Sequence, residues 1–315
     1  MGQAKKRIRK AITDYGLPLF LLLVSALTTT AIGARFMDNF LHGSPAVVTE
    51  ADLWPWPWLL DNPSRFQLGW AFSATLLAIL LIHEFGHYFA CRAHGIRATL
   101  PWVLPAPTLS GTAGAVIQIR SRIPNRRALV DVGVYGPLAG YAASLAAVAV
   151  GFALSHASQP GQPTGLVVFG HPLTLKLVPR LLNLFHPGTP SFDTALRHPV
   201  LIAGWIGLFI TALNLIPGGQ LDGGHLLYAL SPRWHRIVTR CLPVILVACG
   251  VFFWVGWTLW GLMLLIPAMR RHPSVPVNQP LGATRVCACL LALVVFTLTF
   301  AAQPFQGSSI LTYLK

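Results

Sequence analysis

Two histidines, His83 and His87, enclose Glu84 in a His-Glu-Phe-Gly-His segment. On a helix, residues four apart lie one turn apart on the same face, so two imidazoles with this spacing suit one tetrahedral zinc ion. Glu84 is placed to take a proton from a water bound to that metal. A carboxyl group and two imidazoles are costly to bury at membrane depth unless they have a function. The segment therefore indicates a hydrolytic zinc centre.

A catalytic zinc ion needs three protein ligands and one open position for water. Within the apolar regions, the candidates for the third ligand are Asp131, Asp222, His225 and the cysteines. Asp222 is favoured because it follows a Pro/Gly break at the inner end of an apolar run, at the depth of the two histidines. Without a cation, a carboxylate buried there would be destabilising or protonated. His225 is the second choice, and its alternative is a hydrogen-bonded histidine on the cytoplasmic side.

The composition is that of a membrane protein with several spans. Hydrophobic residues make up 54% of the chain and charged residues 10%, and the mean hydropathy is +0.61. The net charge of +14 arises from basic residues beside apolar runs, so anionic lipid headgroups are the expected partners and nucleic acid is not. The five cysteines form no CxxC pair, which favours small side chains in the apolar core over a disulfide framework.

The expected fold class is an all-α polytopic membrane protein with about six or seven spans. The apolar runs that predict spans are 17–32, 66–90, 128–154, 199–216, 242–268 and 286–302. The run 242–268 is either one long span or a hairpin around Trp254 to Trp257. Residues 173–185 predict an amphipathic surface helix. We expect an N-terminal part (1–65), a catalytic core (66–230) and a C-terminal membrane region (231–315).

The segment from Thr99 to Arg127 is too rich in proline, glycine and small residues for a spanning helix. Alternation from Ala115 to Arg120 predicts a short strand. Non-helical backbone at membrane depth must be buried by protein or line a cavity. We therefore expect a re-entrant, β-hairpin-like loop beside the metal, with an ordinary cytoplasmic loop as the alternative. The hypothesis for its function is that Ala113 to Ile119 pairs with an extended substrate by strand addition.

Basic residues set the expected orientation. Lys5 to Lys10 precede the first apolar run and favour an uncleaved first helix with a cytoplasmic N-terminus over a cleaved signal peptide. Arginines follow the His83 to His87 segment and the Asp222 segment, which puts the active-site side in the cytoplasm. The expected location is a bacterial cytoplasmic membrane.

Two separated segments carry a family resemblance. His83 to His87, joined with Asn214 to Gly223, resembles the paired signature of the site-2 proteases, the membrane-embedded zinc metalloproteases. Gly136 to Gly140 is similar to the middle motif of that family. The resemblance covers about residues 66–230 and is strongest to the branch of the chloroplast ethylene-dependent gravitropism-deficient proteases and their bacterial relatives.

This resemblance implies intramembrane proteolysis of a transmembrane protein substrate within the lipid bilayer. It implies one Zn²⁺ per chain on His83, His87 and Asp222, with Glu84 as the general base. It further suggests that Asn214 helps to hold the substrate or the oxyanion. The PDZ or CBS domain that the family commonly adds is not expected within this sequence.

Three alternatives compete with a protease. A non-hydrolytic membrane scaffold or pseudoprotease would have no need for Glu84 at this depth. A membrane metallohydrolase acting on lipid or prenylated substrates would use similar ligands, but the Asp222 segment with its Pro/Gly break fits it poorly. A transporter would show a repeated pair of interrupted helices, and the sequence has no such repeat.

Overall fold

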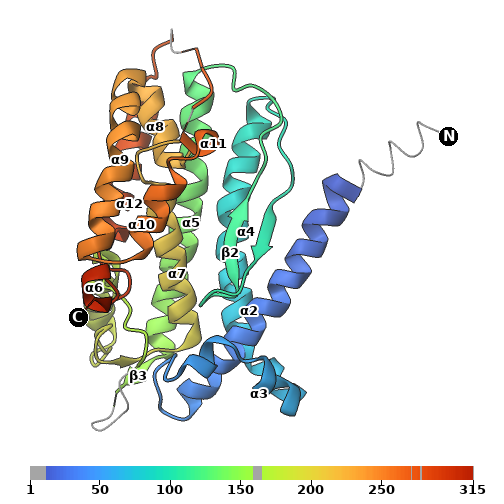
Figure 1. Ribbon diagram of the computed structural model, residues 1–315, viewed down its shortest axis with the longest axis vertical. Coiled ribbons are helices and arrows are strands. Elements are labelled where there is room, and N and C mark those ends of the chain that lie inside the picture. The colour runs from blue at the N-terminus through green and yellow to red at the C-terminus, as the bar shows by residue number, and fades with distance from the viewer. Residues whose placement is uncertain (1–11, 159–164, 271, 277–278, 315) are drawn as a thin grey trace, which may run out of the picture.

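The protein is mostly helical, and most of its long helices lie side by side along the longest axis, whereas α2 is inclined to them (Figure 1). The computed structural model describes residues 12–158, 165–270, 272–276 and 279–314. The long helices are α2 (Leu17–Leu41), α4 (Trp70–Ala93), α5 (Arg126–Leu154), α7 (Pro199–Asn214), α9 (Pro232–Phe252) and α12 (Ala283–Thr299). The short ones are α3 (Trp56–Asp61), α6 (Leu173–Phe185), α8 (Asp222–Leu230), α10 (Gly256–Met263), α11 (Pro267–Arg270) and α13 (Ile310–Tyr313). Within the described ranges, a π-helical turn, η1 (Ile12–Gly16), and two 3₁₀ turns, η2 (Glu50–Leu53) and η3 (Pro63–Gly69), complete the helical elements.

Four described helical segments are long and apolar enough to cross a membrane, judged by length and composition: 13–41, 63–93, 126–154 and 232–252. The helices α7 and α12 are apolar but shorter. Many large apolar side chains on these helices are exposed, among them Phe20, Phe89, Val244 and Leu293. Exposed apolar surface on this scale is matched to lipid rather than to water. A helical membrane protein is thus supported. The basic cluster Lys5 to Lys10 lies outside the described residues.

Residues 242–268 form a hairpin, which is one of the two alternatives that the sequence allows. The helix α9 ends at Phe252, and α10 packs back against it after a short turn. Glycines permit this close approach, because a Cβ atom at Gly250 would overlap Thr258 and one at Gly261 would lie 2.8 Å from the Pro243 carbonyl oxygen.

A two-stranded antiparallel sheet lies between α2 and α4 in Figure 1. It pairs β1 (Trp102–Pro105) with β2 (Thr112–Val116). The strand β2 begins three residues before the predicted alternation from Ala115 to Arg120, and it ends at Val116. Beyond it, Ile119 makes only an isolated bridge with Ala98. The β2 ladder ends there because the Gln118 N–H donates to the Thr99 hydroxyl instead (2.9 Å). A second pair, β3 (His156–Ala157) with β4 (Ala195–Leu196), follows α5.

The first long helix fixes the position of this hairpin. In α2, the Ser25 hydroxyl donates to the Val103 carbonyl oxygen (3.0 Å) and the Thr28 hydroxyl to that of Gly111 (2.7 Å). Gly111 has φ +77°, and a Cβ atom there would lie 2.7 Å from the backbone of Thr28. The hairpin is therefore held directly by the side chains and backbone of α2.

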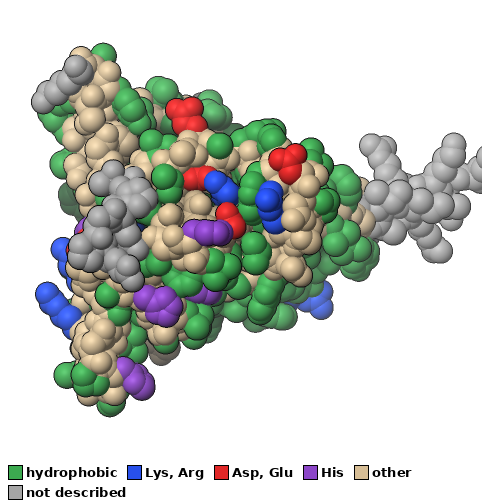
Figure 2. All heavy atoms as spheres, turned by 90° about the horizontal axis from the view of Figure 1, so that it is seen from below, with side chains coloured by type: hydrophobic (Ala, Val, Ile, Leu, Met, Phe, Trp, Pro, Cys, Tyr) green, Lys and Arg blue, Asp and Glu red, His purple; other side chains and the backbone are tan. Residues whose placement is uncertain are grey.

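The core of the molecule lies where α4, α5 and α7 pack together. These helices bury a continuous apolar cluster that includes Phe72, Leu76, Val148, Leu201 and Trp205. Glycines on α5 and α7 shorten the distance between the backbones. The opposite end from α8, shown in Figure 2, carries acidic, basic and histidine side chains among hydrophobic ones. The rigid α4, α5 and α7 core is what positions the chemistry described next.

Candidate metal centre

Three potential ligands from two distant parts of the chain meet inside the helical core. His83 and His87 are buried on α4, and Asp222 is the first residue of α8. One ligand atom from each lies within 4.8 Å of the others. The two Nε2 atoms are 3.1 Å apart, and the Asp222 Oδ2 lies 3.5 Å from that of His83 and 3.3 Å from that of His87.

These separations fit one tetrahedral zinc ion. Bonds of about 2.0–2.1 Å in tetrahedral geometry separate two ligand atoms by about 3.3 Å. The three observed distances scatter around this value. Two imidazoles and one carboxylate are also a donor set that Zn²⁺ accepts. The residues present therefore fit the metal that the sequence implies.

The protonation of His87 follows from its second ring nitrogen. Nδ1 lies 2.7 Å from the Val132 carbonyl oxygen, which can only accept, so Nδ1 carries the proton. In the neutral ring, Nε2 then presents a lone pair toward His83 and Asp222. This contact orients the ring as second partners of metal-bound histidines do.

Two glycines of α5 make room for the imidazoles. A Cβ atom at Gly136 would overlap the His87 ring, and one at Gly140 would lie 2.6 Å from Nδ1 of His83. A third glycine, Gly86 on α4, faces the backbone of Tyr135 on α5. The segment from Gly136 to Gly140 thus packs directly against the histidines.

The helix break between α7 and α8 brings Asp222 to this place. Gly219 has φ +60°, a conformation that side chains other than that of glycine rarely adopt. Gly223 and Gly224 lie so close to the preceding turn that a Cβ atom at either would contact backbone carbonyl oxygens. The break therefore lets α8 start with a carboxylate directed at the α4 histidines.

A cavity of about 210 Å³ opens beside the three ligands. It is lined by Glu84, Asn214 and the strand end from Ala115 to Ile117, among others. Glu84 is buried, and the backbone of Ile117 lies against its carboxyl group. The Asn214 Nδ2 lies 3.2 Å from the His83 Nε2. A carboxyl group, an amide and a strand edge thus face one space next to the ligand atoms.

The other candidates for the third ligand are not part of this group. Asp131 accepts two bonds from Arg285 (2.6 and 2.9 Å) and is 2.7 Å from Nε2 of His94. His225 lines the cavity, but its Nδ1 is paired with the His272 Nε2 (2.8 Å). Within the described residues, the metal-binding group contains neither of them and no cysteine.

The cysteines are only partly what the sequence predicts. All five are free in the structure. Cys91 and Cys289 are buried, whereas Cys241 and Cys287 are exposed. The expectation of core positions is wrong for the exposed pair, because they lie on outward faces of α9 and α12.

Two features of the centre escaped the sequence-based prediction. The contact of His87 with Val132 uses a backbone carbonyl group, which leaves no signal in residue type. The link from His225 to His272 joins residues 47 apart and depends on the fold of the segment after α11. The glycine spacing of Gly136 and Gly140 matches that of His83 and His87, and this equal spacing could have suggested their packing.

Comparison with known proteins agrees with this arrangement. The chain is 33% identical over 235 residues to the probable zinc metalloprotease EGY1, chloroplastic, of Oryza sativa subsp. japonica, covering 71% of this chain and 39% of that protein. It is 32% identical to the Arabidopsis thaliana protein of the same name, covering 71% and 41%. For the probable zinc metalloprotease EGY2, chloroplastic, of Oryza sativa subsp. indica, the identity is 30% and the coverage 70% and 39%.

The chain thus spans about two fifths of the length of these curated relatives. Residues 71–256 match Peptidase family M50, a range that contains both histidines, the α5 glycines and the Asp222 segment. The protein belongs to Peptidase family M50.

Proposed function

We propose that the protein is an intramembrane zinc metalloprotease that hydrolyses a peptide bond in or near a transmembrane segment of a membrane protein. The observation that carries this proposal is the group of His83, His87 and Asp222, with Glu84 buried at the same cavity. Two of its members, His83 and His87, lie on a helix apolar enough to cross a membrane, which supports a membrane substrate. The family supports peptide hydrolysis.

In the proposed reaction, His83, His87 and Asp222 hold one Zn²⁺ per chain. When bound, zinc lowers the pKa of a water toward about 7 and polarises the substrate carbonyl group. Glu84 takes the proton of the attacking water and then delivers it to the leaving amine. The Asn214 amide donates a hydrogen bond to the oxyanion that develops on the carbonyl oxygen.

The β2 edge is the proposed platform for the substrate. A peptide bond within a helix is shielded by its own hydrogen bonds, so the substrate must unwind before it is attacked. One edge of β2 pairs with β1, and residues 115–117 at its end line the cavity. Strand addition there would place an extended backbone beside Glu84. The re-entrant position of this hairpin in the membrane is part of the proposal.

We further propose the orientation and the membrane. Arg92, Arg97 and Arg120 lie near the active-site end, and arginines after α8 follow the same pattern, which supports a cytoplasmic location for this end. A bacterial cytoplasmic membrane is the proposed location, and the chloroplastic names of the relatives make a plastid membrane the alternative to test. The catalytic unit would be residues 66–230.

Identification of the product by mass spectrometry separates this function from its competitors. Wild-type protein and Glu84→Gln are reconstituted with a single-span model substrate and, separately, with a prenylated peptide and a lipid ester. A new carboxyl terminus in the single-span substrate, made by the wild type alone, is the expected result. A lipid or prenyl product would show that the protein is another metallohydrolase and not a protease. If the wild type and Glu84→Gln were both inactive with all substrates, the scaffold would be favoured.

A further inference from the structure

A second cavity lies on the far side of the helix break that carries Asp222. We propose that it binds a phosphate-bearing anion, the headgroup of an anionic phospholipid or a free phosphate compound, and that the bound anion stabilises the α7 to α8 break. The cavity measures about 580 Å³ and lies between α9, α11 and the segment after α11. It is separate from the metal centre, and none of the proposed ligands lines it.

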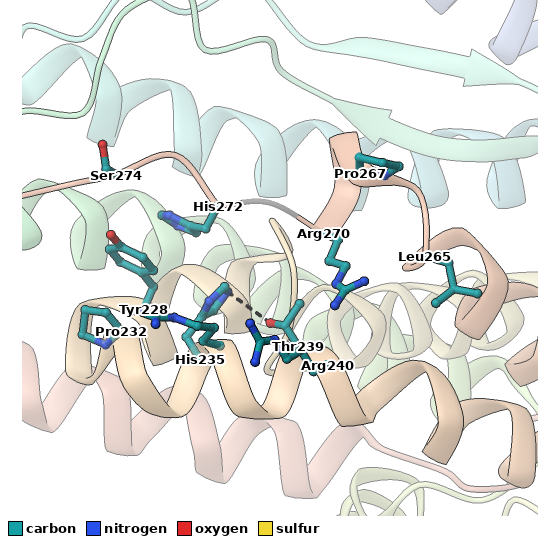
Figure 3. Close-up of a pocket in the computed structure, with 11 residues that line it drawn as sticks. Tyr228, Pro232, His235, Thr239, Arg240, Leu265, Pro267, Arg270, His272 and Ser274 are labelled. Atoms are coloured by element: carbon teal, nitrogen blue, oxygen red, sulfur yellow. Dashed lines mark hydrogen bonds between the residues drawn. The ribbon is translucent and has the colours of Figure 1, made fainter.

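Three guanidinium groups line this cavity. Arg236 and Arg240 project from α9 one turn apart, and Arg270 extends from α11 toward α9 in Figure 3. Guanidinium groups bind phosphate oxygens through paired N–H donors, which makes arginine the residue of choice for such ligands. The cavity therefore presents donors from two elements to one space.

The positive charge of this cavity has no internal compensation. Like charges four residues apart on a helix repel each other, and the first turns of α9 add the positive end of the helix dipole. The sequence contains no aspartate or glutamate after Asp222. Among the residues that the structure describes, none of the three guanidinium groups has a hydrogen-bond or ion-pair partner. An external anion would remove this repulsion.

Neutral polar groups complete the lining. Thr239 and Ser274 supply hydroxyl groups at its wall. Burial lowers the pKa of His272 to about 4, against the opposite effect of its bond to the Pro273 carbonyl group. His272 is therefore neutral near pH 7 and contributes hydrogen bonding rather than charge. Selectivity for an anion thus comes from the arginines.

The same cavity is joined to the helix break by direct contacts. His235 donates from Nε2 to the Gly219 carbonyl oxygen (2.9 Å), and the Gly219 N–H donates to the Thr239 hydroxyl (3.1 Å). Figure 3 shows His235 and Thr239 side by side at the wall. From the α11 side, the Met269 carbonyl oxygen accepts from the Gln220 N–H (2.9 Å).

A second connection runs through histidines to the active-site cavity. His272 donates from Nδ1 to the Pro273 carbonyl oxygen (2.7 Å), so its Nε2 accepts from the Nδ1–H of His225 (2.8 Å). His225 lines the cavity beside Asp222. An anion that draws α9 and α11 together would thus restrain the chain on both sides of Asp222: Gly219 and Gln220 before it, and His225 after it.

The test measures binding without any activity. Full-length protein freed of lipid in detergent is mixed with phosphatidylglycerol or phosphatidylcholine, and retained lipid is counted by native mass spectrometry. A parallel series measures the shift in Tm with inorganic pyrophosphate. The variants are Arg236→Gln, Arg240→Gln and Arg270→Gln. The matched control is Arg233→Gln, which removes an exposed arginine of the same helix outside the cavity lining.

The expected result is tighter binding of the anionic probe and roughly tenfold weaker binding for each cavity arginine removed, with Arg233→Gln like the wild type. Phosphatidylglycerol retention identifies a lipid headgroup as the source, and a pyrophosphate shift with no lipid preference identifies a free phosphate compound. Equal losses in Arg233→Gln and the cavity variants would show diffuse surface attraction and overturn the site. Absence of any preference for the anionic probes would overturn it too.

The effect on cleavage rests on the proposed protease function. The wild type should cleave severalfold faster in bilayers that contain phosphatidylglycerol than in phosphatidylcholine alone. Arg270→Gln should cleave at the same rate in both bilayers, and in phosphatidylcholine alone this rate should equal that of the wild type. If binding follows the arginines but nothing is cleaved in any bilayer, the protease proposal fails and the anion site stands. If cleavage occurs with no response to the anion, the stabilising effect is wrong.

Discussion

Gly136 and Gly140 leave no room for a side chain next to His83 and His87, the proposed metal ligands. Each faces an imidazole so closely that a single methyl group would displace it. Because the ligand separations already match a zinc ion, a small displacement of either ring spoils the geometry. The α5 glycines are therefore as much part of the proposed centre as the ligands.

Replacement of Gly136 by alanine tests this dependence. We expect zinc affinity to fall about 10- to 100-fold, because the His87 ring must move away from His83 and Asp222. The measurement is competition with a chromogenic chelator on folded protein. Gly151→Ala is the control, since its Cβ would strike the backbone of Leu201 on α7 far from the ligands. Equal zinc affinity in Gly136→Ala and the wild type would contradict the account.

Replacement of Asn214 tests the proposed role of its amide. Asn214→Ala should retain zinc but lower kcat about 10²- to 10³-fold, as loss of one oxyanion donor does elsewhere. Turnover of the model substrate and the zinc content are measured on one preparation. Loss of zinc in this variant would instead make Asn214 a residue that positions His83.

Asp131 provides a contrasting case, because the structure places it in an ion-pair network outside the metal group. Asp131→Asn should leave zinc affinity unchanged and lower stability by about 1–3 kcal/mol, since Arg285 and His94 lose a partly buried partner. Thermal unfolding in detergent and a double-variant cycle with Arg285→Gln would measure the coupling. A loss of zinc would contradict the assignment.

The sequence predicts the ligands better than it predicts their surroundings. His83, His87 and Asp222 are indicated by spacing and by a helix break, which are local properties. The choice between Asp222 and Asp131 depends on which helix ends meet in the fold. The contact of His87 with the Val132 carbonyl oxygen uses the backbone, so the type of residue 132 does not indicate it. Such contacts arise from packing between α4 and α5 and become visible only with the fold.

At the scale of elements, α2 and the β hairpin act together. Hydrogen bonds from Ser25 and Thr28 fix the hairpin, which in turn sets the edge of β2 beside the cavity. The helix limits are predicted well for the long apolar run of α5 and for the amphipathic α6. The strand limits are not, because side-chain hydrogen bonds within the hairpin, from Thr112 to Leu104 and from Gln118 to Thr99, replace regular pairing at its ends.

A proline at the end of β2 or in the residue after it tests strand addition. Val116→Pro or Ile117→Pro should abolish cleavage and leave zinc bound, because proline removes the backbone N–H that an added strand needs. Zinc content and cleavage are measured together. Val116→Thr is the control, since it keeps the N–H group and a β-branched side chain. Cleavage by the proline variants at the rate of this control would disprove the strand hypothesis.

The two ends of α5 mark opposite ends of the whole molecule. Its 29 residues extend about 43 Å, with Arg122 before the helix and Ser191 in the segment between α6 and β4 at the opposite end. Arginines such as Arg122, Arg126 and Arg127 gather near the first end, whereas Arg35 near the other end is paired with Asp38 and Asp52. This division of charge supports the proposed orientation.

Single cysteines at these two exposed positions report the orientation. In a background without the five native cysteines, Ser191→Cys should react with an impermeant maleimide from outside intact cells, and Arg122→Cys only after the membrane is opened. Labelling of Arg122→Cys in intact cells would reverse the proposed orientation.

Zinc-dependent proteolysis is best tested by measuring zinc content and cleavage together for the wild type, Glu84→Gln and Asp222→Asn in bilayers. We expect about one zinc per chain and a peptide product for the wild type, and the same zinc without product for Glu84→Gln. For Asp222→Asn we expect weakened zinc binding and no product, since a ligand is lost. Cleavage by Glu84→Gln at the wild-type rate, or full zinc and cleavage in Asp222→Asn, would contradict the proposed mechanism.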